Sequence, residues 1–202
     1  MTDDDEGFSL IELIVSMSVM AVIMVIVTGA ITEVYSDVNR TDNLANARDQ
    51  IGNSFRRLDK ELRYANWVAT PGQVNSAWYL EYGMPGNNCQ QLVFKNGVLT
   101  RATWVSTATS TPGAATTIAT DLAQTGTTAP FTVYQPGDQP YSAGPGVSGV
   151  GIAYQPEHSQ VRLRFTGKVG KTTLPLDVLF SAQNTNRNTS ALSDCSSGRP
   201  TS

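Results

Sequence analysis

The sequence predicts an α+β protein in which one long N-terminal α-helix packs on an antiparallel β-sheet globular domain. The first observation is an apolar, almost uncharged run over residues 8–31. The second is an apolar stripe with helical spacing further along the chain. The third is a change from helical to alternating periodicity after Trp67. Of the 202 residues, enough remain beyond the helix for one soluble domain of ordinary size.

The apolar run at residues 8–31 is long enough to cross a membrane. It contains no proline, and its only ionisable side chain is Glu12. A helix of this length, rising about 1.5 Å per residue, spans the roughly 30 Å hydrocarbon core of a bilayer. A secretory signal peptide would instead have a basic start and an apolar core of about 7–15 residues. Residues 1–7 hold four acidic residues and no basic one, so we do not expect that type of signal.

Glu12 lies where a charge is unfavourable. A carboxylate inside a membrane helix costs at least a few kcal/mol, so it needs a partner or a function. Phe8 lies four residues earlier on the same helix face, and cleavage after Gly7 would give Phe8 a free α-amino group. The alternative is a carboxylate that extends to the membrane surface from near the helix end. The spacing alone leaves both interpretations open.

The stretch GFSLIELI at residues 7–14 resembles the class III signal sequence of type IV pilins and pseudopilins. The resemblance implies that prepilin peptidase cuts after Gly7 and methylates the new N-terminus at Phe8. Residues 1–7 would then be a leader that is removed. It also implies that Glu12 pairs with the N-terminal amine of a neighbouring subunit during filament assembly.

The same resemblance implies a location and a set of partners. Such a precursor crosses the cytoplasmic membrane once, with its N-terminus in the cytoplasm, and later joins an extracellular pilus or a pseudopilus. Its partners would be prepilin peptidase, membrane lipid before assembly, and other pilin subunits bound through the N-terminal helix. The expected function is therefore that of a structural subunit rather than an enzyme.

Two positions depart from the usual pattern of this family. Family leaders usually carry Lys or Arg, whereas residues 1–7 are acidic. The first basic residue, Arg40, follows the membrane span, which is opposite to the positive-inside distribution expected for a cytoplasmic N-terminus. Many major pilins have a proline where Gly29 stands, and glycine, which costs about 1 kcal/mol inside a helix, could soften the same place. Residues 55–65 also resemble the helix end of minor pilins of the PilW and J-pseudopilin kind. The glycine at position 29 and the likeness of residues 55–65 favour a minor subunit.

Residues 32–66 continue the helix with an amphipathic pattern. Apolar residues recur at spacings of four and three: Ile51, Phe55, Leu58, Leu62 and Ala65. We expect one helix over residues 8–64, bent near Gly29 or around residues 39–46, with the apolar stripe seated on the sheet. An independent coiled-coil seam is the alternative, although the stripe covers only about two heptads.

The β-sheet domain is expected at residues 67–183, with a polar tail at 184–202. Predicted strands cover residues 76–82, 91–95, 98–105, 131–134, 150–154, 160–166 and 173–181. Asn96 and Gly97 predict a tight hairpin, because both turn residues tolerate positive φ. Residues 106–130 are almost uncharged and rich in Thr, Ala, Ser and Gly, so we expect an exposed, mobile loop with one short helix or strand.

Cys89 and Cys195 are the only cysteines, and both follow the membrane span. In an oxidising compartment a disulfide between them is the first interpretation, and two unpaired thiols are the alternative.

Charge and motif content indicate no catalytic or metal site, and we expect no cofactor. The net charge of −3 gives no general signature of nucleic-acid binding. Arg162 and Arg164 alternate on one strand face near Lys168 and Lys171, so a DNA-binding or adhesin module on a membrane anchor is the alternative function. Such a row is more often a solvated strand face. The single histidine, His158, is expected in an exposed turn rather than in catalysis.

Overall fold

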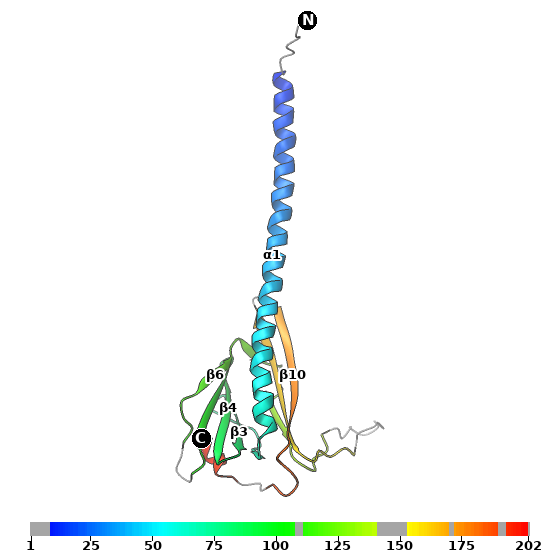
Figure 1. The fold of residues 1–202 in the computed structure, drawn as a ribbon. Coiled ribbons are helices and arrows are strands. Elements are labelled where there is room, and N and C mark those ends of the chain that lie inside the picture. Colours follow the sequence, from blue (N-terminus) through cyan, green and yellow to red (C-terminus); the bar gives the residue numbers. More distant parts are fainter. Residues whose placement is uncertain (1–8, 108–110, 141–152, 170–171, 190–192, 202) are drawn as a thin grey trace. The chain divides into compact units, whose positions relative to one another are not determined.

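The computed structural model describes residues 9–107, 111–140, 153–169, 172–189 and 193–201, apart from the side chains at 46–48, 50, 51, 169, 172 and 194. The predicted α+β layout is confirmed, since one N-terminal helix precedes antiparallel sheets (Figure 1). The chain divides into two compact units, Met1–Ala47 and Arg48–Ser202.

The helix α1 extends over Leu10–Arg63 and has 54 residues. The sequence predicted residues 8–64, of which Phe8 lies outside the described part of the chain. No proline interrupts this stretch, so every backbone N–H after the first turn can donate to the carbonyl four residues earlier. From Leu10 to Val38 the large apolar side chains of the first unit are exposed, from 46% at Val27 to 78% at Leu10. This part of α1 therefore has an apolar surface without a covering partner in the described residues.

The second unit contains two antiparallel sheets, where the sequence predicted one. The first has the strand order β1-β3-β4-β5-β6 with β2 also paired to β3. Its strands are β1 Trp67–Val68, β2 Gly72–Val74, β3 Ala77–Met84, β4 Asn88–Lys95, β5 Val98–Val105 and β6 Thr116–Ala119. The second has the order β10-β9-β7 with β8 also paired to β9. Its strands are β7 Leu122–Gln124, β8 Phe131–Tyr134, β9 Ser159–Val169 and β10 Thr172–Ala182.

Alternating periodicity located most of the longer strands but not the short ones. β5 and β8 match the predicted bounds, and β4, β9 and β10 extend one to three residues beyond them, whereas β3 begins one residue later and ends two residues later than predicted. The expected loop at 106–130 contains two strands, β6 and β7, which are too short and too poor in large apolar residues to stand out in the sequence. The strand predicted at 150–154 is not present at 153 and 154, and its other residues lie outside the described part.

The hairpin between β4 and β5 depends on Asn96 and Gly97. Both residues have positive φ, 51° and 81°, as a two-residue turn between right-twisted strands requires. A Cβ on Gly97 would also lie 2.9 Å from the carbonyl oxygen of Leu122, whose N–H donates to the Gly97 carbonyl. The turn therefore fixes the register of β4 on β5 and holds the start of β7 in the second sheet.

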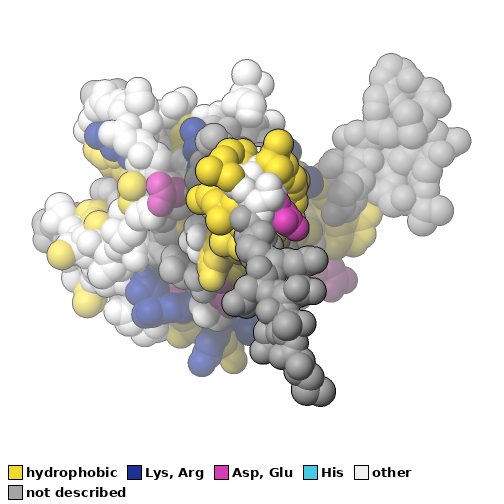
Figure 2. All heavy atoms as spheres, turned by 90° about the horizontal axis from the view of Figure 1, so that it is seen from above, with side chains coloured by type: hydrophobic (Ala, Val, Ile, Leu, Met, Phe, Trp, Pro, Cys, Tyr) yellow, Lys and Arg dark blue, Asp and Glu magenta, His cyan; other side chains and the backbone are white. Residues whose placement is uncertain are grey.

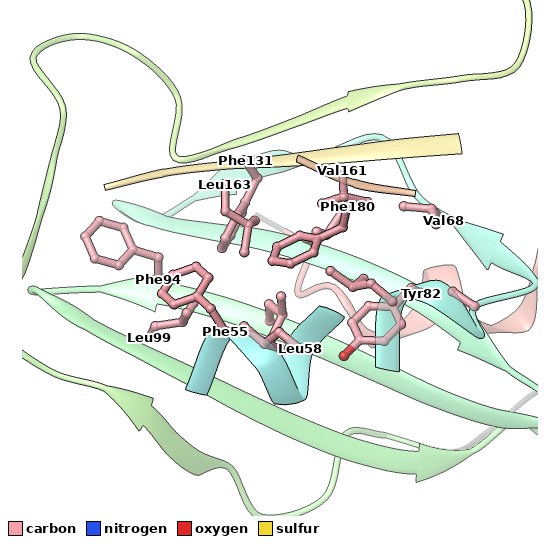
Figure 3. Close-up of a cluster of buried hydrophobic side chains, with 14 of the residues drawn as sticks. Phe55, Leu58, Val68, Tyr82, Phe94, Leu99, Phe131, Val161, Leu163 and Phe180 are labelled. Carbon is pink, nitrogen blue, oxygen red and sulfur yellow. The ribbon is translucent and has the colours of Figure 1, made fainter. Parts of the chain in front are cut away.

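The core lies where the last turns of α1 meet both sheets. Phe55, Leu58 and Leu62 of the predicted stripe are buried, and the side chain of Ile51 lies outside the described part. Figure 3 shows Phe55 and Leu58 pointing toward side chains from the strands, including Phe180. The centroid of the Phe55 ring lies 6.4 Å from that of Phe180 and 6.5 Å from that of Phe165 on β9. The stripe thus seats the helix on the sheets, as the sequence predicted.

The outer strand of the second sheet, β10, contains a proline. Pro175 is exposed and stands opposite Thr166 of β9. Among the described strands, β9 is the one neighbour of β10. Because proline has no backbone N–H to donate, it fits a strand only where that position points away from the ladder, as at an edge.

Candidate functional site

Glu12 lies in the first turn of α1, where a negative charge is favoured by the helix dipole. Its backbone N–H donates to the carbonyl of Ser9 at 2.9 Å, and its own carbonyl accepts from the Ser16 hydroxyl at 2.7 Å. The side chain is exposed. Within the described residues, no hydrogen-bond or ion-pair partner contacts its carboxylate, so the backbone is satisfied and the charge is not.

The surroundings of Glu12 are apolar. The next charged residue along the chain is Glu33, and Leu10, Ile11 and Leu13 beside Glu12 are all more than half exposed. Viewed toward the N-terminal end, hydrophobic side chains cover most of the visible helix surface (Figure 2). The helix over Leu10–Ala45 is long and apolar enough to cross a membrane, by length and composition. Glu12 is therefore a single acidic group on a surface suited to lipid or to other apolar helices.

Two further predicted site residues, Gly7 and Phe8, lie outside the described part of the chain. The processing roles predicted for Gly7, Phe8 and Glu12 remain predictions at this point.

At the other end of the chain, Cys89 of β4 and Cys195 form a disulfide, with an S–S distance of 2.02 Å and Cα atoms 5.3 Å apart. Cys195 lies in a short 3₁₀ helix, η1 Asp194–Gly198. Both cysteines are buried, together with Trp67, Ala69 and Trp104. The part of the polar tail around Cys195 is therefore packed against the first sheet.

Three polar residues beside the disulfide were not recognised from the sequence: Glu81, Gln91 and Arg199. Glu81 and Gln91 are buried in the centres of β3 and β4. The Gln91 amide donates to Glu81 Oε1 at 3.0 Å and to the Gly198 carbonyl at 2.7 Å. A signal was present, because Cys89 and Gln91 are two residues apart and share a strand face. A disulfide at Cys89 implies that this face is covered.

A partly buried charge pair joins α1 to the first sheet. Glu61 Oε1 accepts from Arg101 Nη1 and also lies 3.3 Å from Arg57 Nε. Glu61 Oε2 and Arg101 Nε have no hydrogen-bond partner in the described structure. Burial raises the pKa of the nearby Tyr82 hydroxyl well above its ordinary value, and the charge of Glu61 raises it further. Tyr82 therefore stays neutral and donates to Gln90 Oε1 at 2.8 Å.

In the described residues, the basic strand face is partly neutralised by an acidic side chain. Arg162 makes two hydrogen bonds to the carboxylate of Asp177 on β10, at 2.7 and 2.6 Å. These bonds hold the pKa of Asp177 below its usual range. Arg164 donates to the Thr132 hydroxyl at 3.2 Å, and Lys171 lies outside the described residues. Since Asp177 neutralises one of the basic groups, the arrangement is that of a paired strand face.

The remaining candidates have structural roles. His158 is partly buried and donates from Nδ1 to the Thr185 carbonyl, which ties the start of β9 to the tail. Trp67 and Trp104 are packed beside the disulfide. In the part of the chain that the structure describes, no group of His, Cys, Asp and Glu side chains could hold a metal ion.

A cavity of about 430 Å³ lies beside the tail, and its lining includes Glu81, Gln135, Ser159 and Arg199. Their polar groups bond to one another or to the backbone: Gln135 donates to the Val68 carbonyl and accepts from Ser159 Oγ. Arg199 donates to Glu81. Gln135 thus connects β1 with β9, and Arg199 connects the tail with β3.

Comparison with known proteins agrees with the geometry of the N-terminal segment. A family model, the prokaryotic N-terminal methylation motif, matches residues 4–28 and so covers the start of α1 but not the sheet domain. No curated protein and no solved structure matches the chain. The matched family is structural rather than enzymatic. The chain thus carries a prokaryotic N-terminal methylation motif, the class III signal, as expected of a type IV pilin-like protein.

Proposed function

We propose that this protein is a minor pilin or pseudopilin: a subunit that enters or initiates a type IV pilus-like filament after cleavage behind Gly7 and N-methylation of Phe8. The observation that carries the proposal is Glu12, the one charge between residues 8 and 32, within the matched motif and without a partner in the described residues. A simple membrane anchor has no need of such a carboxylate.

The physical argument concerns the charge of Glu12. An acidic side chain in the hydrocarbon region costs roughly 2.5–3.5 kcal/mol on insertion scales, and an ionic partner recovers part of that cost. Cleavage after Gly7 creates an amine at Phe8, and a neighbouring subunit would bring that amine to Glu12. Pairing between subunits then favours assembly over the separate, lipid-embedded state.

A minor role is supported by Gly29, at a position where many major pilins have proline, and by the likeness of residues 55–65 to minor pilins. The single apolar segment supports one membrane crossing. The acidic leader would lie in the cytoplasm, where the peptidase acts. Before assembly the partners are lipid and prepilin peptidase, and afterwards other pilin subunits.

The cleavage step is tested by replacing Gly7 with leucine. We expect the variant to remain as precursor in the membrane and to be missing from sheared filaments. The intact mass of the wild-type protein should correspond to a chain that begins at N-methylated Phe8. A mature wild-type chain that retains residues 1–7 would refute the proposal.

The assembly step is tested by Glu12→Gln, which removes the charge and keeps the side-chain size. The variant should insert and be cleaved normally, because its helix is more apolar, but its amount in filaments should fall several-fold. Ser18→Ala, six residues further along the same exposed helix, is the matched control and should assemble normally. Normal incorporation of Glu12→Gln would leave Glu12 without an assembly role and favour a membrane-tethered binding module instead.

A further inference from the structure

Residues 193–199, here called the C-terminal clip, cover the face of the first sheet that points away from α1. Strand alternation puts Leu80 and Tyr82 on the α1 side and Glu81 on the opposite side. Cys195 is buried there through the disulfide. A Cβ on Gly198 would lie 2.5 Å from the ring of Trp104, so the clip is in close contact with the sheet.

Glu81 depends on the clip for its counter-charge. Its side chain is 1% exposed, and a buried carboxylate is strongly unfavourable without a partner. Arg199 supplies the pairing: its Nε lies 3.2 Å from Glu81 Oε1, and its Nη2 donates to Oε2. The same Nη2 donates to the Thr70 carbonyl at 2.8 Å. Arg199 is the one cation in ion-pair contact with Glu81 in the described structure.

Arg199 and Cys195 are four residues apart and are connected through η1. A guanidinium seated on Glu81 therefore restricts where the Cys195 sulfur can be. The Gly198 carbonyl, which accepts from Gln91, lies between them in sequence and adds a second fixed point.

We propose that Arg199 is a positioning residue for the Cys89–Cys195 disulfide: its ion pair with Glu81 docks the clip and places the Cys195 thiol against Cys89. Docking by the ion pair and closure of the disulfide favour the same clip position. By thermodynamic linkage, each stabilises the other to the same extent.

Thiol–disulfide exchange with glutathione measures how strongly the Arg199–Glu81 ion pair and the disulfide stabilise each other. The thiols of Cys89 and Cys195 lose two electrons and two protons and form one S–S bond, while glutathione disulfide is reduced to two molecules of glutathione. The equilibrium constant gives the effective concentration of one thiol relative to the other. A docked clip raises this quantity, whereas a mobile clip lowers it.

The experiment equilibrates the full-length chain, in detergent micelles, with a series of glutathione buffers and measures the oxidised fraction by alkylation and mass spectrometry. Arg199→Gln should lower the effective concentration by about tenfold or more, since a hydrogen-bonded charge partner is lost. Arg187→Gln is the matched control: Arg187 is also in the tail but donates to Gln155 instead. It should stay within about twofold of the wild type.

A rescue variant separates charge compensation from packing. Glu81→Gln combined with Arg199→Gln should recover most of the lost effective concentration, because no uncompensated charge remains on the sheet. Arg199→Lys keeps the charge but not the bidentate hydrogen bonding of the guanidinium. Its effective thiol concentration should therefore lie between those of the wild type and Arg199→Gln.

Equal values for Arg199→Gln and Arg187→Gln would overturn the proposal. A loss in Arg199→Gln that Glu81→Gln does not restore would overturn it as well, since Arg199 would then act through packing. If Arg199→Gln does not fold, as judged by tryptophan fluorescence, the comparison of Arg199→Lys with the double variant decides. In that case the proposal requires two results. Arg199→Lys must have a lower effective thiol concentration than the wild type, and the double variant must have a larger folded fraction than Arg199→Gln alone.

Discussion

Replacing Phe55 by alanine tests whether the amphipathic stripe of α1 stabilises the second unit. Phe55 is 6% exposed, and its ring contacts two other phenylalanine rings with centroids 6.4 and 6.5 Å away. Truncation of a buried phenylalanine costs about 3–5 kcal/mol, from lost transfer free energy and from the cavity that remains. Domains of this kind have about 5–15 kcal/mol of stability in total. We therefore expect Phe55→Ala to remove a fifth or more of this stability.

The assay is urea unfolding of the full-length chain in detergent micelles, followed by tryptophan fluorescence. Trp67 and Trp104 are buried on the first sheet and report its unfolding. With a slope of about 1–3 kcal/mol per molar urea, the midpoint should fall by more than about 1 M. Arg56→Ala is the matched control, because this neighbouring side chain is exposed and should change stability by no more than about 0.5 kcal/mol.

A loss below about 1 kcal/mol in Phe55→Ala would contradict the structural reasoning. It would mean that the helix end contributes little to the core and that the two sheets hold together by themselves. Phe55→Leu should give an intermediate loss, since leucine fills part of the space but makes no ring contacts.

Two further predictions concern the tail and the strand β9. Cys195→Ser should lower the unfolding free energy by up to about 4–5 kcal/mol, because the disulfide closes a loop of 106 residues. The variant should also expose the tail to protease while leaving cleavage at Gly7 unchanged. Alkylation of both cysteines without reductant in surface-derived protein would show that no disulfide forms. Because Arg162 depresses the pKa of Asp177, this pair stabilises the fold fully above the ordinary aspartate pKa of about 3.9, and the contribution is lost as the pH falls through the lower folded value. Asp177→Asn should therefore weaken the acid dependence of unfolding measured between pH 6 and the acid transition, and an unchanged dependence would exclude a contribution from this pair.

Local sequence patterns were sufficient where the deciding contacts are close in the chain. The apolar spacing of Phe55, Leu58 and Leu62 identified the buried helix face, because a 3.6-residue period depends on near neighbours alone. The hairpin at Asn96 and Gly97 was predictable for a similar reason, since the turn itself requires positive φ.

The partners of the strands and the cover of the first sheet could not be derived in this way. Phe131 stands opposite Leu163, 32 residues later, and a strand pattern does not specify which distant strand it joins. Glu81 alternates with apolar residues, a pattern typical of a face exposed to water. Its actual partner, Arg199, is 118 residues away, so the burial of Glu81 follows from the tail and not from its own strand.

Pro175 on the outer strand β10 affects whether this sheet edge can pair with a strand of another molecule. A sheet edge with unbroken N–H and C=O groups can template another strand and so begin cross-β aggregation. Pro175 lacks one donor in the middle of this edge, and exposed Asp177 puts a charge two residues away. Both are devices by which natural sheets discourage an incoming strand. The edge of β10 is therefore a poor template for a strand from another copy of the chain.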